Sequence, residues 1–298
     1  MELKNGLRGL LGEVKNNVAI ELERTPEVEP AGDSLVYDDL KIEARRWKVI
    51  DDAVVVMADL KNSTKLGMNK WVQSTANIYE ASTGSVAKIF DDFGADFISI
   101  QGDGAYAIFW GERRIERALC AGVTIKTFGE DLLEQLKTKW DSLPDTGLKV
   151  GIASGKLLAK KVGVRRKPGS QAPIWPGKPV NYAFKASASV DKNQMAVTKS
   201  VWNAIKANDF LTWSCTCNGE PSLLWQDLTI KKLPEGAPER QGMFLASAWC
   251  PNCGEEFCES ILRGEKKRSE VDKPRLQVSL ERKRANELKA TRNLRGVK

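Results

Sequence analysis

The sequence predicts an α+β fold in which helices flank a sheet built partly from hairpins. The first observation is a near-continuous apolar run at 53–58, which is typical of a buried strand within Val49 to Leu60. The second is a pair of short apolar segments joined by the tight turn Gln101-Gly102-Asp103-Gly104. The third is helical apolar spacing over 66–93 and 115–140. Strands that alternate with both helices and hairpins argue against a uniform βαβ repeat.

Each element follows from its local pattern. Apolar residues at helical spacing predict a helix within 1–24, and the segment Thr25 to Asp33, rich in proline and acid, reads as a linker. Two apolar segments around Ser154-Gly155 predict a second hairpin. The expected strands are 97–100, 105–110, 148–153, 156–162 and 195–197, and the later helices are 181–190 and 201–205.

The composition excludes several kinds of chemistry. The chain contains no histidine, which rules out Ser-His-Asp and Cys-His triads and zinc sites with histidine ligands. The formal charge of +7 lies in the tail 263–298, which holds 13 Lys or Arg against 5 Asp or Glu. Such a tail is typical of a solvated or partly helical extension, and contact with nucleic acid or a membrane surface is the alternative.

The apolar runs bear on localisation. The longest of them are far shorter than the roughly 20 residues of a membrane-spanning helix. The N-terminal segment also lacks the apolar core and cleavage site of a signal peptide. We therefore expect a cytoplasmic protein with no membrane span.

Two carboxylates mark the candidate site. Asp59 ends a strand that is apolar on both faces, and Asp103 lies in the hairpin turn. Neighbouring buried acids repel each other unless a cation lies between them, and Mg²⁺ or Mn²⁺ uses one or two carboxylates together with substrate phosphates. The polar turn from Leu60 to Gly67 opens a helix, whose first N–H groups can cradle phosphate. The simpler alternative is that Asp59 caps this helix and Asp103 forms the turn.

Four motifs in order resemble the class III nucleotidyl cyclases, the adenylyl and guanylyl cyclase family. The family has a strand ending in Ala-Asp, an Ile-Gly-Asp hairpin, a strand pair containing Val-Gly-Ile, and a helix carrying Asn and Arg. Their counterparts here are Ala58 to Leu66, Gln101 to Tyr106, Lys149 to Gly155 and Gly177 to Lys185. The resemblance covers about residues 48–205.

This resemblance implies a ferredoxin-type antiparallel sheet with flanking helices and a two-metal cyclase. Asp59 and Asp103, with the Leu60 carbonyl, would hold two Mn²⁺ or Mg²⁺ ions per site. By position, the resemblance implies that phosphates are bound by Asn62, Ser63, Thr64 and Lys149. It also implies that Asn181 orients the ribose and that Lys185 acts on the α-phosphate. In the family the metal acids and the Asn/Arg helix come from opposite subunits, which implies an antiparallel homodimer.

The predicted domains follow the chain in four parts. They are an N-terminal helix and linker at 1–46, the cyclase domain at 47–207, C-terminal strands with a cysteine-rich region at 208–262, and the basic tail at 263–298.

The base-reading positions depart from the familiar purine cyclases. Ser99 replaces the lysine or glutamate of the family, and Ile174 beside Trp175 replaces its Asp or Cys partner. Lys185 replaces an arginine, so it keeps the charge and loses the bidentate fork. This pocket is similar to that of the Pycsar pyrimidine cyclases of bacterial anti-phage defence, whose products activate a neighbouring effector.

That similarity favours conversion of UTP to cyclic UMP. Ser99 can donate or accept a hydrogen bond, so it does not separate uracil from cytosine. Cytidylate cyclisation and purine (adenylate) cyclisation therefore remain alternatives. A non-enzymatic alternative is an inactive cyclase-like module that binds nucleic acid.

Five of the six cysteines fall late in the sequence. Cys215 and Cys217 form C-x-C, and Cys250 and Cys253 form C-P-N-C. Two close pairs in a reducing cytoplasm predict a structural Cys₄ zinc site, a zinc-knuckle or zinc-ribbon-like region, with reduced thiols as the alternative. Cys258 is a further candidate ligand.

Overall fold

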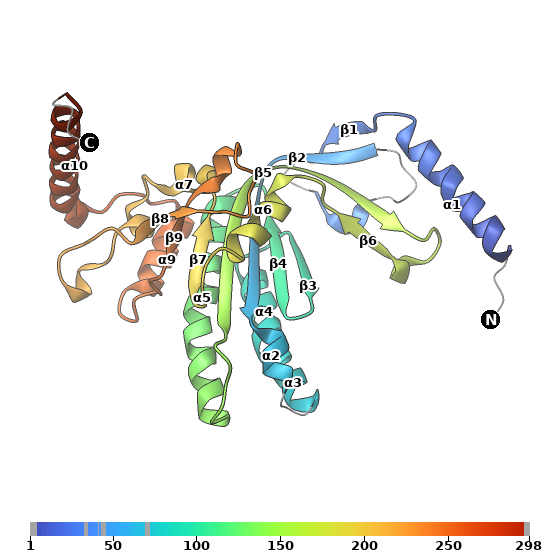
Figure 1. The fold of residues 1–298 in the computed structure, drawn as a ribbon, viewed down its shortest axis with the longest axis horizontal. Coiled ribbons are helices and arrows are strands. Elements are labelled where there is room, and N and C mark those ends of the chain that lie inside the picture. Colours follow the sequence, from blue (N-terminus) through green and yellow to red (C-terminus); the bar gives the residue numbers. More distant parts are fainter. Residues whose placement is uncertain (1–4, 33–34, 41, 43–45, 69–71, 295–298) are drawn as a thin grey trace. The chain divides into compact units, whose positions relative to one another are not determined.

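The structure is a computed structural model that describes residues 5–32, 35–40, 42, 46–68 and 72–294 (Figure 1). The chain forms two compact units. Unit 1 comprises residues 1–50 and 158–175, and unit 2 comprises residues 51–157 and 176–298. Two long strands, β2 (Arg46–Lys61) and β5 (Gly147–Gly163), contribute residues to both units.

The described residues of unit 1 form one α-helix and two short strand pairs. The helix α1 (Gly6–Leu22) confirms the expected N-terminal helix, and none of its residues is buried. The expected linker instead contains the strand β1 (Glu27–Pro30), which pairs in parallel with the start of β2. Ion pairs from Arg46 and Lys48 to the acids of β1 reinforce this pairing. The acids that suggested a linker thus face basic partners, and residues 33 and 34 of the predicted linker lie outside the described residues. The second pair joins β6 (Gln171–Ile174) to the end of β5.

The main sheet has the strand order β3-β4-β2-β5-β7-β9-β8. The remaining strands are β3 (Phe97–Gln101), β4 (Gly104–Phe109), β7 (Gln194–Val197), β8 (Trp225–Thr229) and β9 (Gln241–Leu245). The predicted hairpin is confirmed as β3 and β4, which pair antiparallel. The expectation of an antiparallel sheet is wrong in this respect, because β5 and β7 are parallel and the sheet as a whole is mixed. A parallel neighbour requires a crossover, which the helix α6 (Lys178–Ser187) provides.

The second predicted hairpin is wrong, because β5 is one continuous strand through Ser154 and Gly155. Its first half pairs with β7 and its second half with β6. The turn-like glycine takes a φ of +146° within the strand, a conformation that favours a residue without a Cβ. The glycine therefore marks the point where the strand changes partners, and two segments with different partners produced the same local pattern as a hairpin.

Helices cover the sheet of unit 2. The long α5 (Arg114–Lys139) confirms its prediction and buries 11 of its residues, more than any other helix described. The predicted helix over 66–93 is divided into α2 (Ser63–Gly67), α3 (Val72–Tyr79), a π-helical turn at Glu80–Gly84 and α4 (Ser85–Asp92), and residues 69–71 lie outside the described part. The buried Ser82 hydroxyl donates to the Ile78 carbonyl at 2.7 Å beside that turn, competing locally with the backbone ladder.

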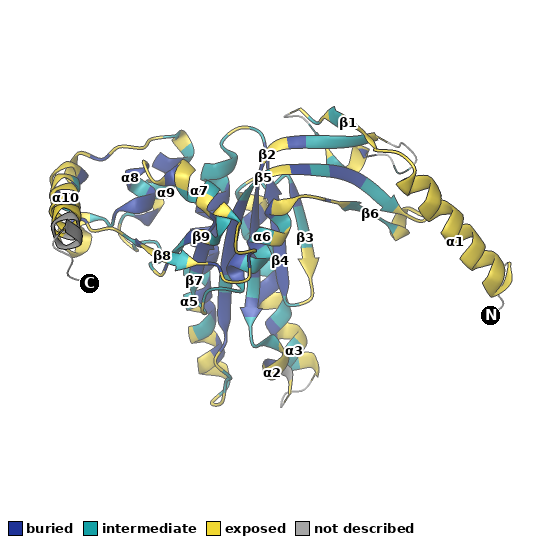
Figure 2. Cartoon of the chain, turned by 45° about the horizontal axis from the view of Figure 1, so that its top comes forward, coloured by how far each residue is buried: buried dark blue, intermediate teal, exposed yellow. Residues whose placement is uncertain are grey.

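Among the described residues in the C-terminal part of unit 2, two α-helices precede the β8–β9 hairpin and two follow it. They are α7 (Lys199–Ile205), α8 (Asp209–Thr212), α9 (Gly254–Arg263) and α10 (Asp272–Leu294). Figure 2 shows the buried residues concentrated in the central strands and α5, whereas α10 is largely exposed. The basic tail is therefore a helix for most of its length. Within the described part of the chain, no helix is long and apolar enough to cross a membrane.

Candidate active site

The two candidate metal ligands lie at one end of the β2–β4 pair. Asp59 on β2 is paired with Gly104 on β4, so Asp103 in the adjoining turn follows directly beyond this pair. Gly104 permits the close approach, because a Cβ there would lie 2.8 Å from the Ala58 carbonyl oxygen. The side chain of Asp59 is 31 % exposed, and Asp103 is half-buried. Register thus brings together two carboxylates that lie 44 residues apart in the sequence.

The donor set fits a hard divalent cation. Both groups offer only oxygen ligands when ionised, and the adjacent Leu60 carbonyl is a further oxygen. The ammonium of Lys149 on β5 stands 2.7 Å from one carboxylate oxygen of Asp59. This contact shows that the Asp59 carboxylate accepts a cationic group, and it places the predicted phosphate-binding lysine beside a predicted metal ligand.

The predicted phosphate turn is held to the loop before β5. Asn62 has a φ of +56°, which is uncommon for a residue with a side chain, and its amide donates to the Asp145 carbonyl at 2.7 Å. The Thr146 hydroxyl donates to the Lys61 carbonyl at 2.7 Å. These two bonds fix the backbone just before Ser63, where α2 begins.

Charges on the same loops surround that turn. The Lys61 ammonium contacts Asp145 at 2.6 Å and Asp191 at 2.5 Å, and Lys192 also pairs with Asp145. Hydrogen bonds from Lys192, which has the larger effect, and from Lys61 lower the pKa of Asp145 to about 2. Asp145 therefore stays ionised throughout the neutral range and ties the turn to the segment before β7.

The predicted ribose and α-phosphate ligands lie on α6. Asn181 is exposed and Lys185 half-buried, and their spacing of four residues puts them on one face of the helix. Within the described ranges, neither side chain has a hydrogen-bond or ion-pair partner. They are thus available to a ligand or to another chain.

The helix α6 packs on β5 through a glycine. A Cβ at Gly151 would lie 2.2 Å from both the Ala183 carbonyl oxygen and the Ser187 backbone nitrogen. Gly151 and Lys149 are two residues apart on β5 and share a face of the strand. The close contact therefore sets the height of α6 over the face that presents Lys149.

The predicted base-contacting residues fall in different places. Ser99 on β3 pairs with Tyr106 on β4 and hydrogen-bonds to its hydroxyl. Burial raises the pKa of Tyr106, whose ring lies 5.7 Å from that of Phe184 on α6. Ile174 on β6 is exposed and Trp175 is buried, and both belong to unit 1. The structure thus brings Ser99 to the β3–β4 hairpin and assigns the other two to the other unit.

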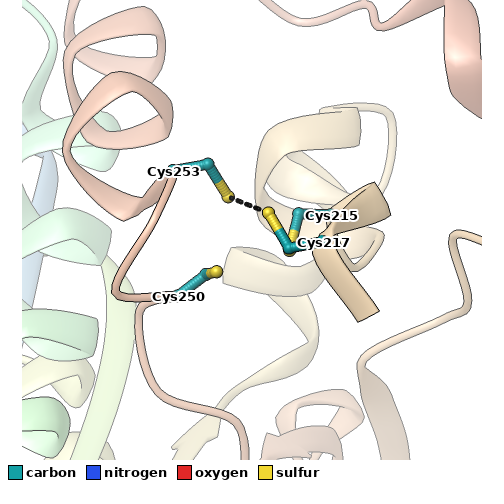
Figure 3. Close-up of side chains that lie close together, drawn as sticks. All are labelled: Cys215, Cys217, Cys250 and Cys253. Carbon is teal, nitrogen blue, oxygen red and sulfur yellow. Dashed lines mark hydrogen bonds between the residues drawn. The ribbon is translucent and has the colours of Figure 1, made fainter. Parts of the chain in front are cut away.

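The cysteines separate into a cluster and a pair. The sulfur atoms of Cys215, Cys217, Cys250 and Cys253 lie within 4.8 Å of one another (Figure 3). The candidate Cys258 is outside this cluster, because it lies on α9 against Cys120 of α5, whose thiol is 3.9 Å from the Cys258 carbonyl oxygen. The sequence pattern could not exclude Cys258, since it follows Cys253 by only five residues.

Sequence reasoning missed the residues that support the site. Asp145 lies 84 residues from Lys61, and no local pattern reports such a pairing. Tyr106 could have been found, because a two-residue turn at 102–103 fixes the pairing of residue 99 with residue 106. Gly151 belongs to the segment Lys149 to Gly155 that resembles the family, but its contact with α6 is visible only in the structure.

Comparisons with known proteins agree with this geometry. Residues 46–223 match the adenylate and guanylate cyclase catalytic domain. A protein from Micromonospora echinofusca named uridylate cyclase is 50% identical over 266 residues, covering 89% of this chain and 87% of that protein. One from Propioniciclava tarda with the same name is 42% identical over 294 residues, covering 96% and 93%.

Solved structures extend the agreement to the fold. The adenylyl cyclase CyaB from P. aeruginosa superposes with a TM-score of 0.53 at 14% identity, covering 69% of this chain and 98% of that one. The guanylyl cyclase Cya2 gives 0.51 at 15% identity, covering 67% and 94%. The matched family region contains Asp59, Asp103, Lys149 and the whole of α6. The chain therefore belongs to the adenylate and guanylate cyclase catalytic domain family and is a nucleotidyl cyclase.

Proposed function

We propose that this cyclase converts UTP to 3′,5′-cyclic UMP and pyrophosphate. The observation that carries the base assignment is the 50% identity, over most of both chains, to a protein named uridylate cyclase. The Ser99 side chain is consistent with this assignment, because a small hydroxyl replaces the charged base readers of purine cyclases. It does not by itself favour uracil over cytosine, so the choice of uracil is supported by the name of the relatives alone.

Asp59, Asp103 and the Leu60 carbonyl would hold two Mn²⁺ or Mg²⁺ ions. When bound, the ions would lower the pKa of the ribose 3′-hydroxyl and offset the charge of the triphosphate. The oxygen-only donor set and the ammonium that already contacts Asp59 support this assignment. The Lys149 ammonium contacts Asp59, and with substrate bound it would turn to the triphosphate.

The protein's own groups would position the substrate. The backbone N–H groups of Asn62, Ser63 and Thr64 would donate hydrogen bonds to phosphate oxygens. The hydrogen bonds from the side chains of Asn62 and Thr146 hold this turn in place. Asn181 would hydrogen-bond to the ribose, and the Lys185 ammonium would stabilise charge that develops on the α-phosphate. The ribose 3′-hydroxyl would lose its proton to solvent, its oxygen would form a bond to the α-phosphorus, and the bond between the α-phosphorus and pyrophosphate would break.

We propose that the working form is a homodimer with the sites at its interface. Asn181 and Lys185 share a face of α6 and have no partner among the residues that the structure describes. Asp59, by contrast, is paired within its own chain. This division supports a site in which the acids of one chain face the α6 of another.

The product would act as a second messenger in the cytoplasm. Relatives that carry the name uridylate cyclase support the formation of cyclic UMP. The resemblance of the base-reading positions to those of the Pycsar cyclases suggests a role in anti-phage defence, in which the cyclic nucleotide would activate a downstream effector. The reaction itself has no need of that effector.

The test is to incubate the purified protein separately with UTP, CTP, ATP and GTP in the presence of Mn²⁺ and to separate the products by chromatography. Cyclic UMP as the main product is expected. Dominant cyclic CMP or cyclic AMP would overturn the base assignment. Absence of any cyclic product, together with salt-sensitive nucleic-acid binding that is lost on deletion of 263–298, would overturn the enzymatic proposal as well.

A further inference from the structure

Four cysteines from two segments of unit 2 meet at one point (Figure 3). Cys215 directly precedes the short 3₁₀ turn Thr216–Asn218 that follows α8, and Cys217 lies within it. Cys250 and Cys253 lie on the turn before α9. The side chains point toward one another, and their four sulfur atoms lie within 4.8 Å of one another. We propose that these four cysteines bind one structural zinc ion, at a site separate from the nucleotide-binding metals.

The sulfur spacing fits ligands that share one ion. A tetrahedral zinc with Zn–S bonds of about 2.3 Å places its sulfur atoms about 3.8 Å apart. The sulfur atoms of Cys217 and Cys253 are 3.8 Å apart. A disulfide would require about 2.05 Å. The distance between these sulfurs therefore matches two corners of a zinc tetrahedron and is far too long for a covalent bond.

The turn that carries Cys250 and Cys253 is shaped for a thiolate. The backbone N–H groups of Asn252 and Cys253 donate to the Cys250 sulfur, and the N–H of Gly254 donates to the Cys250 carbonyl at 2.8 Å. A Cβ at Gly254 would lie 2.8 Å from the Cβ of Trp249, so the tight turn requires glycine there. Hydrogen bonds to a ligand sulfur are the outer contacts that orient metal ligands.

The same turn is anchored to α5. The backbone N–H of Trp249 donates to Thr127 at 3.0 Å, and its indole N–H donates to Thr124 at 2.9 Å. The C-x-C segment has its own turn, closed by Gly219 at a φ of +118°. The two segments are separated in the sequence by β8 and β9. An ion bound by both segments would therefore connect the C-x-C turn to the turn that is anchored on α5.

The ligand chemistry favours zinc. Four thiolates in a tetrahedral arrangement select zinc or iron among the common metals, and they exclude the hard ions that suit carboxylates. Cys217 is exposed and the other three cysteines are half-buried, so an ion can enter from solvent. Cys258 contacts Cys120 and lies outside the cluster. Because it is on α9, close in sequence to Cys253, it is a suitable control for the cluster cysteines.

The test is metal analysis of the full-length protein by mass spectrometry, after purification without chelator. About one zinc per chain is expected in the wild type. Cys250→Ser and Cys253→Ser should each reduce the zinc content at least about tenfold, because a site with three thiolates binds far more weakly. The matched control Cys258→Ser should keep the wild-type content.

A second measurement uses only the wild-type protein, so it does not require that the cysteine variants fold. Wild-type protein stripped of metal is titrated with Co²⁺ alone, and the thiolate-to-cobalt absorption of a tetrahedral site should saturate at about one ion per chain. A lower melting temperature of the stripped protein, restored by Zn²⁺, is expected with it. Wild-type protein without zinc, stoichiometric iron in its place, or a Cys258→Ser variant that loses zinc as completely as Cys250→Ser would overturn the proposal.

Discussion

Gly151→Ala tests whether the contact between β5 and α6 sets the geometry of the site. The new Cβ would lie 2.2 Å from two backbone atoms of α6, and real Cβ contacts are essentially never shorter than 3.0 Å. The helix must therefore move by about 0.8 Å or more. A misplacement of about 1 Å in a positioning element costs about 10²-fold in rate, and overpacking costs about 1–3 kcal/mol of stability.

The assay measures the melting temperature and the turnover number with UTP and Mn²⁺ for the same preparation. We expect a folded protein with a lower melting temperature and a turnover number reduced about 10²-fold. Gly236→Ala is the matched control, because a Cβ at this position would have no atom within 4 Å and the φ of Gly236 is not positive. Wild-type turnover in Gly151→Ala would refute the reasoning that α6 is held at a required height.

Three further predictions concern single contacts. Asp145→Asn should raise the KM for the nucleotide by about fivefold at most, because solvent weakens ion pairs at an exposed carboxylate. The pKa of Asp145 is about 2, lowered from 3.8, so its stabilising effect is complete above about pH 4 and is lost as the pH falls toward 2. The melting temperatures of the wild type and Asp145→Asn should thus converge over that range, and a constant difference would contradict the ion pairing. Lys185→Ala should lower the turnover number by about 10²-fold or more, whereas Lys185→Arg should retain activity and Lys206→Ala, a control just after α7, should change nothing. Tyr106→Phe should lower the melting temperature by about 2–4 °C, because it removes about 1 kcal/mol of hydrogen bonding from Ser99 and keeps the ring; an unchanged melting temperature would count against that bond.

Local patterns predicted most elements of the fold. The apolar run at 53–58, the hairpin around Asp103 and the periodic helix α5 all depend on neighbouring residues, and the structure confirms them. The errors occurred where distant partners decide. Gly155 resembled a turn because the two halves of β5 pair with different strands, and the acidic segment at 27–30 resembled a linker until its basic partners were placed beside it.

The candidate site divides in the same way. Asp59 and Asp103 could be placed together from sequence through the ordered motifs of the cyclase family, and the β2–β4 register puts them at one end of that strand pair. The bonds that hold the phosphate turn join residues 83 to 85 positions apart, and these came only from the tertiary structure. The roles of Ile174 and Trp175 stay predictions, since they depend on the placement of unit 1. The roles of the other site residues likewise stay predictions until they are tested by substitution.

The metal dependence of the two acids tests the central claim most directly. Cyclic UMP formation from UTP is measured with increasing Mn²⁺ for the wild type, Asp59→Ala, Asp103→Ala and the control Asp227→Ala, an exposed carboxylate on β8. We expect both site variants to fold and to lose activity by about 10³-fold or more at every Mn²⁺ concentration, because the ligands of the ions are gone. The control should follow the wild-type curve. Wild-type rates of cyclic UMP formation in either site variant would contradict the account.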